Sequence, residues 1–255
     1  TGRPELLRTY SAERRAVAQE LIDFDREFAQ MFSAEATVDT ADTGADGVDP
    51  ARFQEYFQQH GRFTAGTATR YAPSILTAGT GYQHLVTGFP VGMRFHSAPV
   101  VRLTDARPLH LGHVVEADGR WRLFAFADSG RARLDRLCAY LGDDPRSPVR
   151  RHTPDGWDVD AVIDVRAVLQ EPHAALELGD LPALLRPTKG RYGLTDPEKA
   201  FCPDPTDDIF AARGIDRAEG ALVVVRPDQY VAALLPLDAT DELAEFFASV
   251  LAEPL

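Results

Sequence analysis

The spacing of apolar residues divides the chain into a helical beginning, an irregular middle and a mixed remainder. Between Pro4 and Phe32 apolar side chains recur every three or four residues, which predicts one long amphipathic helix. Nothing adjacent in the sequence is able to cover its apolar side alone. We therefore expect this helix to be the tail of a domain that a longer protein supplies.

The middle of the chain shows neither the helical spacing of three to four residues nor the alternation of a strand. Residues 34–50 are small, acidic and glycine-containing, which is typical of a solvated linker. Their aspartates lack the spacing of an EF-hand calcium loop: Asp39, Asp42, Asp46 and Asp49. A short helix is expected at 51–60, followed by a long Gly-, Thr- and Pro-rich segment that we expect to be largely irregular up to about residue 98.

Beyond residue 98 short apolar runs alternate with helical segments. We expect strands at 98–103, 109–115, 120–127, 158–165, 221–226 and 230–235. We expect helices at 130–141, near 180–184, near 207–213 and at 239–251. The last two strands flank the short turn 227–229 and predict a hairpin.

This order of elements is strand, helix, strand, a longer excursion, a hairpin and a closing helix. It matches a thioredoxin-like α/β domain, with a central mixed sheet and flanking helices, preceded by a helical segment. We assign residues 1–60 to the helical tail with its acidic linker, and 61–255 to the thioredoxin-like domain.

Net charge, hydrophobicity and cysteine content limit the binding partners and the cellular location that the chain can have. A net charge of −12 over 255 residues, with no basic stripe, argues against nucleic acid. No apolar run is long enough to span a membrane, and the first residues lack a signal core. The two cysteines lie far apart, which favours a reducing cytoplasm over a disulfide framework. Because the chain begins with Thr1 rather than Met, we expect it to be part of a longer polypeptide.

Thiol chemistry is the first function to weigh on such a scaffold. Redox proteins often place Cys-x-x-Cys between the strand and the helix, where the helix dipole lowers the pKa of the thiol. Here the turn holds Asp128, Ser129 and Gly130. Cys138 falls two turns into the helix on its apolar side, and Cys202 lies in an expected acidic loop. A thiol redox enzyme using Cys138 or Cys202 is the alternative that we expect to fail.

The sequence also lacks motifs for metal binding, for a serine nucleophile and for dinucleotide binding. His110 and His113, three apart on an expected strand, should point to opposite faces, and no third ligand has a zinc-site spacing. Neither Gly-x-Ser-x-Gly nor Gly-x-Gly-x-x-Gly occurs. We therefore expect no catalytic, cofactor-binding or metal-binding residue in this chain.

The segment from Gly81 to Val100 is rich in aromatic and histidine side chains. We interpret it as an interdomain contact loop; its candidate residues are His84, Phe89, Met93, Arg94, Phe95 and His96. Two alternatives remain open: the aromatics pack onto the domain's own sheet, or the loop binds a small aromatic ligand in a stand-alone module.

Three segments, in order, resemble one family. LLRTYSAERRAVAQELIDFD looks like the final helix of the FAD domain in flavin-dependent aromatic hydroxylases. GFPVGMRFHSAPVVRLTDARPLHLGHVVEADGRWRLFAFAD and ALVVVRPDQYVAALLPLD resemble the entry and the closing hairpin of the C-terminal domain in the phenol hydroxylase branch. That branch includes phenol 2-monooxygenase and 3-hydroxybenzoate 4-monooxygenase.

The resemblance implies a three-part enzyme that uses FAD, NADPH and dioxygen to hydroxylate a phenolic ring. It assigns this chain to a redox-inactive C-terminal dimerisation part, with the end of the FAD domain attached. The implied partners are the missing N-terminal FAD and substrate domain and a second copy of the chain. The family's FAD motifs are absent here, so no catalytic residue carries over.

Overall fold

The computed structural model describes residues 5–36, 61 and 65–252. The chain divides into two units, with boundaries between Leu6 and Leu7 and between Thr69 and Arg70. Each unit is described by itself. The aspartates of the expected linker and the expected helix at 51–60 lie outside the described residues.

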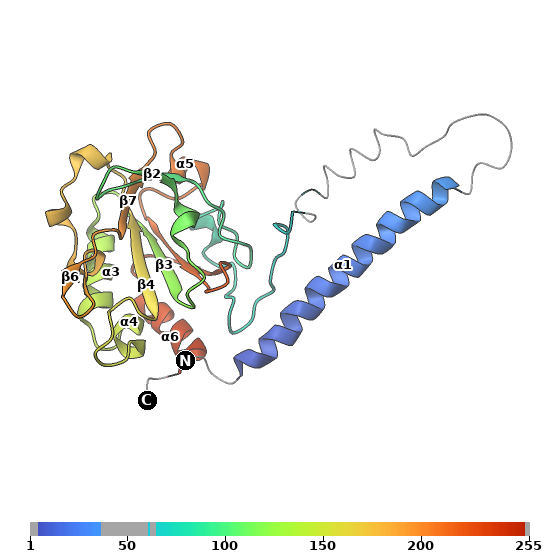
Figure 1. Cartoon of the computed structure of the whole chain (residues 1–255), viewed down its shortest axis with the longest axis horizontal. Coiled ribbons are helices and arrows are strands. Elements are labelled where there is room, and N and C mark those ends of the chain that lie inside the picture. The colour runs from blue at the N-terminus through green and yellow to red at the C-terminus, as the bar shows by residue number, and fades with distance from the viewer. Residues whose placement is uncertain (1–4, 37–60, 62–64, 253–255) are drawn as a thin grey trace. The chain divides into compact units, whose positions relative to one another are not determined.

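The long helix α1, Leu6–Ala36, makes up most of the described part of the first unit (Figure 1). The helix predicted from the sequence is confirmed, and it continues four residues further than expected, into the segment interpreted as linker. Alanine and glutamate there are good helix formers, which explains the extension. Four large apolar side chains of α1 are exposed: Leu7, Tyr10, Leu21 and Ile22.

The second unit is built on a seven-stranded mixed sheet with the order β2-β1-β7-β4-β3-β8-β9. Its strands are β1 Pro99–Arg102, β2 Pro108–His110, β3 Trp121–Phe126, β4 Ile163–Val168, β7 Ala200–Pro203, β8 Ala221–Val225 and β9 Val231–Leu235. The strands β5 Thr188–Lys189 and β6 Leu194–Thr195 form a separate two-stranded hairpin.

In the described part of the second unit, four α-helices and five short 3-10 helices accompany the sheet. The α-helices are α3 Ala132–Asp143, α4 Pro148–His152, α5 Ile209–Ala212 and α6 Thr240–Val250. The 3-10 helices are η1 Gln83–Leu85, η2 Leu111–Val114, η3 His173–Ala175, η4 Leu178–Asp180 and η5 Ala183–Leu185.

The central strands have the predicted connectivity. β3 leads through α3 and α4 to β4, which pairs with β3 in parallel. The β8–β9 hairpin then returns antiparallel on the other edge of β3, and α6 closes the chain. Strand, helix, strand, hairpin and closing helix is the thioredoxin-like order, and a mixed sheet with flanking helices is confirmed.

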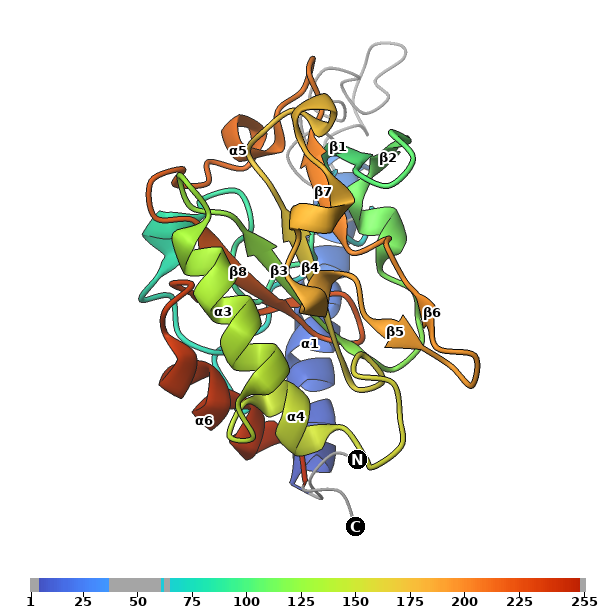
Figure 2. The same cartoon turned by 90° about the vertical axis from the view of Figure 1, so that its left-hand side faces the viewer.

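Alternating side chains of β3 build two cores. Trp121, Leu123 and Ala125 face α3 and α6, the side that faces the viewer in Figure 2. Phe124 and Phe126 face the opposite side, where residues of the loop 85–98 and of α5 cover the sheet. The strand is buried on both faces, which explains why it reads as a nearly continuous apolar run.

Several boundaries differ from those expected. The strand predicted at 109–115 ends at His110 and continues as η2, and β4 begins at Ile163 rather than 158. The short β7 and α4 were missed, and the helix expected near 180–184 is only the 3-10 turn η5.

The loop before β1 contributes to the core through two phenylalanines. The ring of Phe95 lies between Phe89 and Phe124, with centroid distances of 4.6 Å to each. Gln83 ties the loop together, because its side-chain amide donates to the carbonyls of Val86 and Phe89 and accepts from the N–H of Val91. The loop is therefore a structural layer of the domain despite having almost no regular structure.

Replacing Phe89 by alanine should lower the free energy of unfolding by about 3–5 kcal/mol, because it removes a fully buried ring from this layer. Arg94→Ala, an exposed position of the same loop, is the control and should change stability by less than about 0.5 kcal/mol. Urea unfolding followed by circular dichroism measures both. A Phe89→Ala variant as stable as the control would show that the loop is not part of the core.

Candidate functional site

The turn between β3 and α3 is the place where a thioredoxin-type redox centre would be. In this chain the buried carboxylate of Asp128 occupies it and accepts the N–H groups of Arg133 and Leu134, at 3.1 Å each. A carboxylate at the first turn satisfies free N–H donors and complements the helix dipole. The position that could activate a thiolate is used to cap a helix.

Both cysteines are buried thiols. Cys138 lies on the apolar side of α3, as predicted, and burial raises the pKa of its thiol to about 12. Cys202 lies in β7, not in a loop, and burial raises its pKa to about 12 as well. Thiolates are the reactive form, so this environment disfavours redox chemistry at either sulfur.

The two histidines of the HLGH segment do meet, contrary to the expectation. η2 begins immediately after His110, so the chain turns and brings the ring of His113 to 5.6 Å from that of His110. The prediction of opposite faces assumed a continuous strand and is wrong. Among the described residues no group of three or more His, Cys, Asp or Glu side chains is placed to hold a metal ion.

The candidate contact loop separates into two kinds of residue. Phe89 and Phe95 are buried in the domain's own core, which is the packing alternative considered for the aromatics. His84 and Arg94 are exposed, and Met93 and His96 are half-buried. Only these four are available for contact with another domain.

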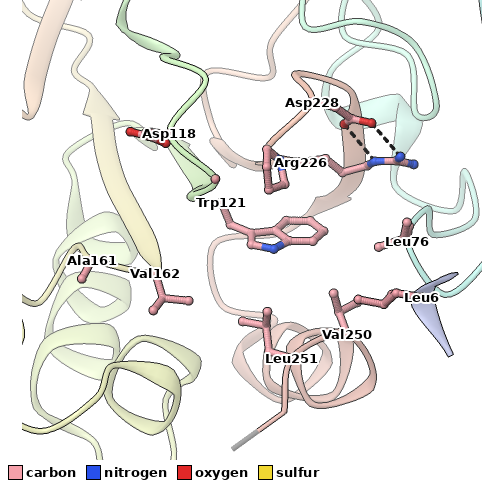
Figure 3. Close-up of a pocket in the computed structure, with 12 residues that line it drawn as sticks. Leu6, Leu76, Asp118, Trp121, Ala161, Val162, Arg226, Asp228, Val250 and Leu251 are labelled. Carbon is pink, nitrogen blue, oxygen red and sulfur yellow. Dashed lines mark hydrogen bonds and ion pairs between the residues drawn. The ribbon is translucent and has the colours of Figure 1, made fainter. Parts of the chain in front are cut away.

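A hollow of about 530 Å³ opens beside Trp121 at the end of β3 (Figure 3). Its apolar wall comes from α6, the turn before β4 and the loop before β1: Val250, Leu251, Val162, Ala161 and Leu76. The guanidinium of Arg226 is held by Asp228, with hydrogen bonds of 3.0 and 2.8 Å. Asp118 is paired with Arg122. The hollow suits an apolar group, and its charged side chains are already committed.

Sequence reasoning missed the most unusual feature of the domain, a buried charge cluster made of Arg122, Asp160, Asp164 and Lys199. Arg122 of β3 lies opposite Asp164 of β4 in the parallel register, and its Nε is 3.0 Å from the carboxylate. Lys199 donates to Asp164 at 2.7 Å and also to Asp160. All four side chains are at least nine-tenths buried.

The rim of the cluster supplies further partners. Asp118 accepts two hydrogen bonds from the guanidinium of Arg122, at 3.1 and 2.6 Å. Lys189 of β5 donates to Asp160 at 2.7 Å and to Asp196 at 3.2 Å. Burial alone would raise the pKa of Asp160, but the ammonium groups of Lys189 and Lys199 hold it at about 2. Each buried charge of the cluster lies beside an opposite one, although the buried Nε–H of Arg122 has no hydrogen-bond partner, and we interpret the cluster as organising structure.

Comparison with known proteins identifies the family. Residues 69–255 match the family model described as phenol hydroxylase, C-terminal dimerisation domain. The chain belongs to this family. It is 56% identical over 254 residues to 3-hydroxybenzoate 4-monooxygenase from Comamonas testosteroni, covering 96% of this chain and 39% of that protein.

A fungal relative is more distant. The FAD-dependent monooxygenase terD of Aspergillus terreus is 34% identical over 260 residues, covering 97% of this chain and 42% of that protein. The chain thus spans about two fifths of the length of these relatives. The resemblance to flavin-dependent aromatic hydroxylases, noted from three segments, is confirmed.

Solved structures are similar only at a low level. A thiol:disulfide interchange protein from Bacteroides sp. gives a TM-score of 0.38 at 12% identity, covering 65% of this chain and 92% of that chain. A peroxiredoxin-like protein from Aquifex aeolicus gives a TM-score of 0.35 at 11% identity, covering 61% and 84%.

The buried thiols should be inert in the folded protein. With a pKa of about 12, only about one thiol in ten thousand is a thiolate near pH 8, and the sulfur is also shielded by the core. Iodoacetamide should modify Cys138 and Cys202 within minutes in denaturant but not in buffer, as followed by intact mass. Rapid modification of either in buffer would revive the redox alternative.

The charge cluster should give the domain a steep acid limit. A carboxylate with a depressed pKa stabilises the fold above its unfolded pKa, about 3.9, and this stabilisation is lost as the pH falls toward about 2. Asp160 alone accounts for a loss on the order of 2 kcal/mol between these values.

Asp160→Asn is the variant that tests this assignment. It should destabilise the protein by about 3 kcal/mol near neutral pH, because it weakens the pairing of buried Lys199. It should also lose less of its remaining stability than the unmodified chain on acidification. Urea unfolding at several pH values measures both, and an equally steep acid profile in the variant would contradict the role of Asp160.

Proposed function

We propose that this chain is the C-terminal part of an FAD- and NADPH-dependent aromatic monooxygenase of the phenol hydroxylase type, and that it contributes homodimerisation rather than chemistry. The observation that carries the proposal is the match of residues 69–255 to a dimerisation domain of that family. The relative at 56% identity is named a 3-hydroxybenzoate 4-monooxygenase, so a phenolic acid is the substrate class favoured for the whole protein.

The described residues support a non-catalytic role. The position suited to a reactive cysteine holds the helix-capping Asp128, and both thiols have raised pKa values. The hollow beside Trp121 is lined by apolar side chains and by charges that are already paired.

FAD does not fit this chain. The sequence has no Gly-x-Gly-x-x-Gly turn to hold a pyrophosphate, and Arg226, which lines the hollow beside Trp121, already pairs with Asp228. We therefore place FAD and NADPH in the N-terminal region of the complete protein and derive no reaction step from this chain.

Two surfaces suit contact with that N-terminal region. The helix α1 exposes Leu7, Tyr10, Leu21 and Ile22, as expected for a helix that completes another domain. The exposed and half-buried residues of the contact loop, such as His84 and Arg94, are the second candidate. A cytoplasmic location agrees with two free, buried cysteines.

Absorbance and hydrodynamics test the proposal together. The purified chain, verified by intact mass, should elute from a sizing column as a colourless dimer and should turn over no phenol with NADPH. If a larger N-terminal polypeptide co-elutes with yellow flavin, activity should belong to that complex. Stoichiometric flavin bound to these 255 residues alone would contradict the assignment of cofactor chemistry to the rest of the protein.

A further inference from the structure

Exposed apolar side chains are unevenly distributed over the second unit. From Arg70 onward, the described residues with a large exposed apolar side chain are Ile75, Trp157, Tyr192 and Leu194. The last three are 65%, 71% and 68% exposed and come from only two segments, the turn before β4 and the β5–β6 hairpin. We call Trp157, Arg191, Tyr192 and Leu194 the hairpin patch.

The two segments of the patch are joined. The N–H of Gly190 donates to Asp158 at 2.8 Å, and Lys189 bonds to Asp160 at 2.7 Å. The hairpin is thus fastened to the buried charge cluster, although it stands apart from the main sheet (Figure 2). An exposed surface held rigid in this way loses little entropy when it binds a partner.

The composition of the patch is that of an interface centre. Trp, Tyr and Arg are the residues most often found to dominate binding energy. The guanidinium of Arg191 lies 4.5 Å from the ring centroid of Tyr192, which orders both side chains. Beside them is a hollow of about 620 Å³, whose walls include Trp157, Arg191 and Lys189. In a two-fold dimer the projecting side chains of the patch on one copy can enter the hollow of the other copy, and the reverse.

We propose that the hairpin patch is the surface through which two copies of this chain associate about a two-fold axis. This inference rests on the proposed function, in which the domain forms a homodimer. The patch lies inside residues 69–255, the part that matches the dimerisation family, whereas α1 lies outside that match. A second copy is therefore favoured over the N-terminal region as the occupant.

Charge and backbone support the same partner. Two copies with a net charge of −12 repel each other unless the contact brings basic groups against acidic ones. Both signs are exposed here, since Arg191 belongs to the patch and Asp155 lies two residues before Trp157. In the described part of the chain β5 and β6 pair only with each other, so their outer edges are free to pair antiparallel across a two-fold axis.

The first test uses the 255-residue chain with Trp157→Ala and Tyr192→Ala, singly and together. Each substitution should raise the dimer dissociation constant at least about tenfold, as central aromatic residues typically do. Ile75→Ala, an exposed apolar residue outside the patch, is the control and should leave the constant unchanged. Sedimentation equilibrium measures the constants, and circular dichroism verifies that each variant is folded.

Disulfide cross-linking is a second measurement, which detects the contact while the dimer remains intact. Leu194→Cys should form a disulfide-linked dimer under mild oxidation, because the two copies place this position near the axis. Ala139→Cys, at an exposed position of α3, should not, and the native thiols are buried. A dimer that tolerates both alanine substitutions and does not cross-link at Leu194→Cys would overturn the patch but keep the dimer. A chain that is monomeric at every concentration would overturn both.

Discussion

The guanidinium of Arg122 sets the main constraint on this domain. It lies on the central strand β3 with about 1% of its surface exposed, where an unpaired charge would be very costly. The guanidinium forms ion pairs with Asp164 of β4 and with Asp118 in the turn before β3. Lys199, just before β7, forms a further ion pair with Asp164. These partners fix the register of three neighbouring strands, since shifting any strand by one residue would leave a buried charge alone.

The same cluster extends outward to the surface. Asp160 forms an ion pair with Lys189 of β5. This ion pair anchors the two-stranded β5–β6 hairpin, which is too short to be stable alone. Buried ion pairs contribute little net stability compared with apolar packing, so a cluster of this size is better understood as specifying a geometry. The geometry it specifies includes the position of Trp157 and Tyr192. The buried charge cluster and the surface proposed for association are thus linked through the ion pair of Asp160 with Lys189.

Pattern and motif in the sequence predicted much of this fold. The apolar run of β3, the helix after it, the β8–β9 hairpin and the closing helix all carry strong local signals, and the structure has them where expected. The sequence places Asp128, Ser129 and Gly130 in the turn where Cys-x-x-Cys would lie, and the structure adds that Asp128 accepts hydrogen bonds from the start of the next helix. Two local predictions failed: the strand expected at 109–115 ends at His110 and continues as η2, and β7, which has only 4 residues, was not recognised.

The charge cluster could not be predicted in the same way. Lys199 is separated from Asp160 and Asp164 along the chain by the excursion between β4 and β7, and each of the three alone reads as an ordinary surface residue. The β5–β6 hairpin is hidden for the same reason, because its two-residue strands have no periodicity to detect. Phe89 and Phe95 lie in a segment without helical or strand periodicity, so the sequence alone does not separate core packing from a contact surface; the structure does so by placing Phe95 against Phe124.

The central claim is that a hairpin held by buried charges is the surface through which two copies of this domain associate. The most direct measurement is amide hydrogen exchange of residues 188–195 at protein concentrations above and below dimer dissociation. The account predicts that these amides are protected in the dimer and exchange faster in the monomer, while β3 and β4 exchange slowly in both. Equal exchange of the hairpin in the two states would contradict the claim.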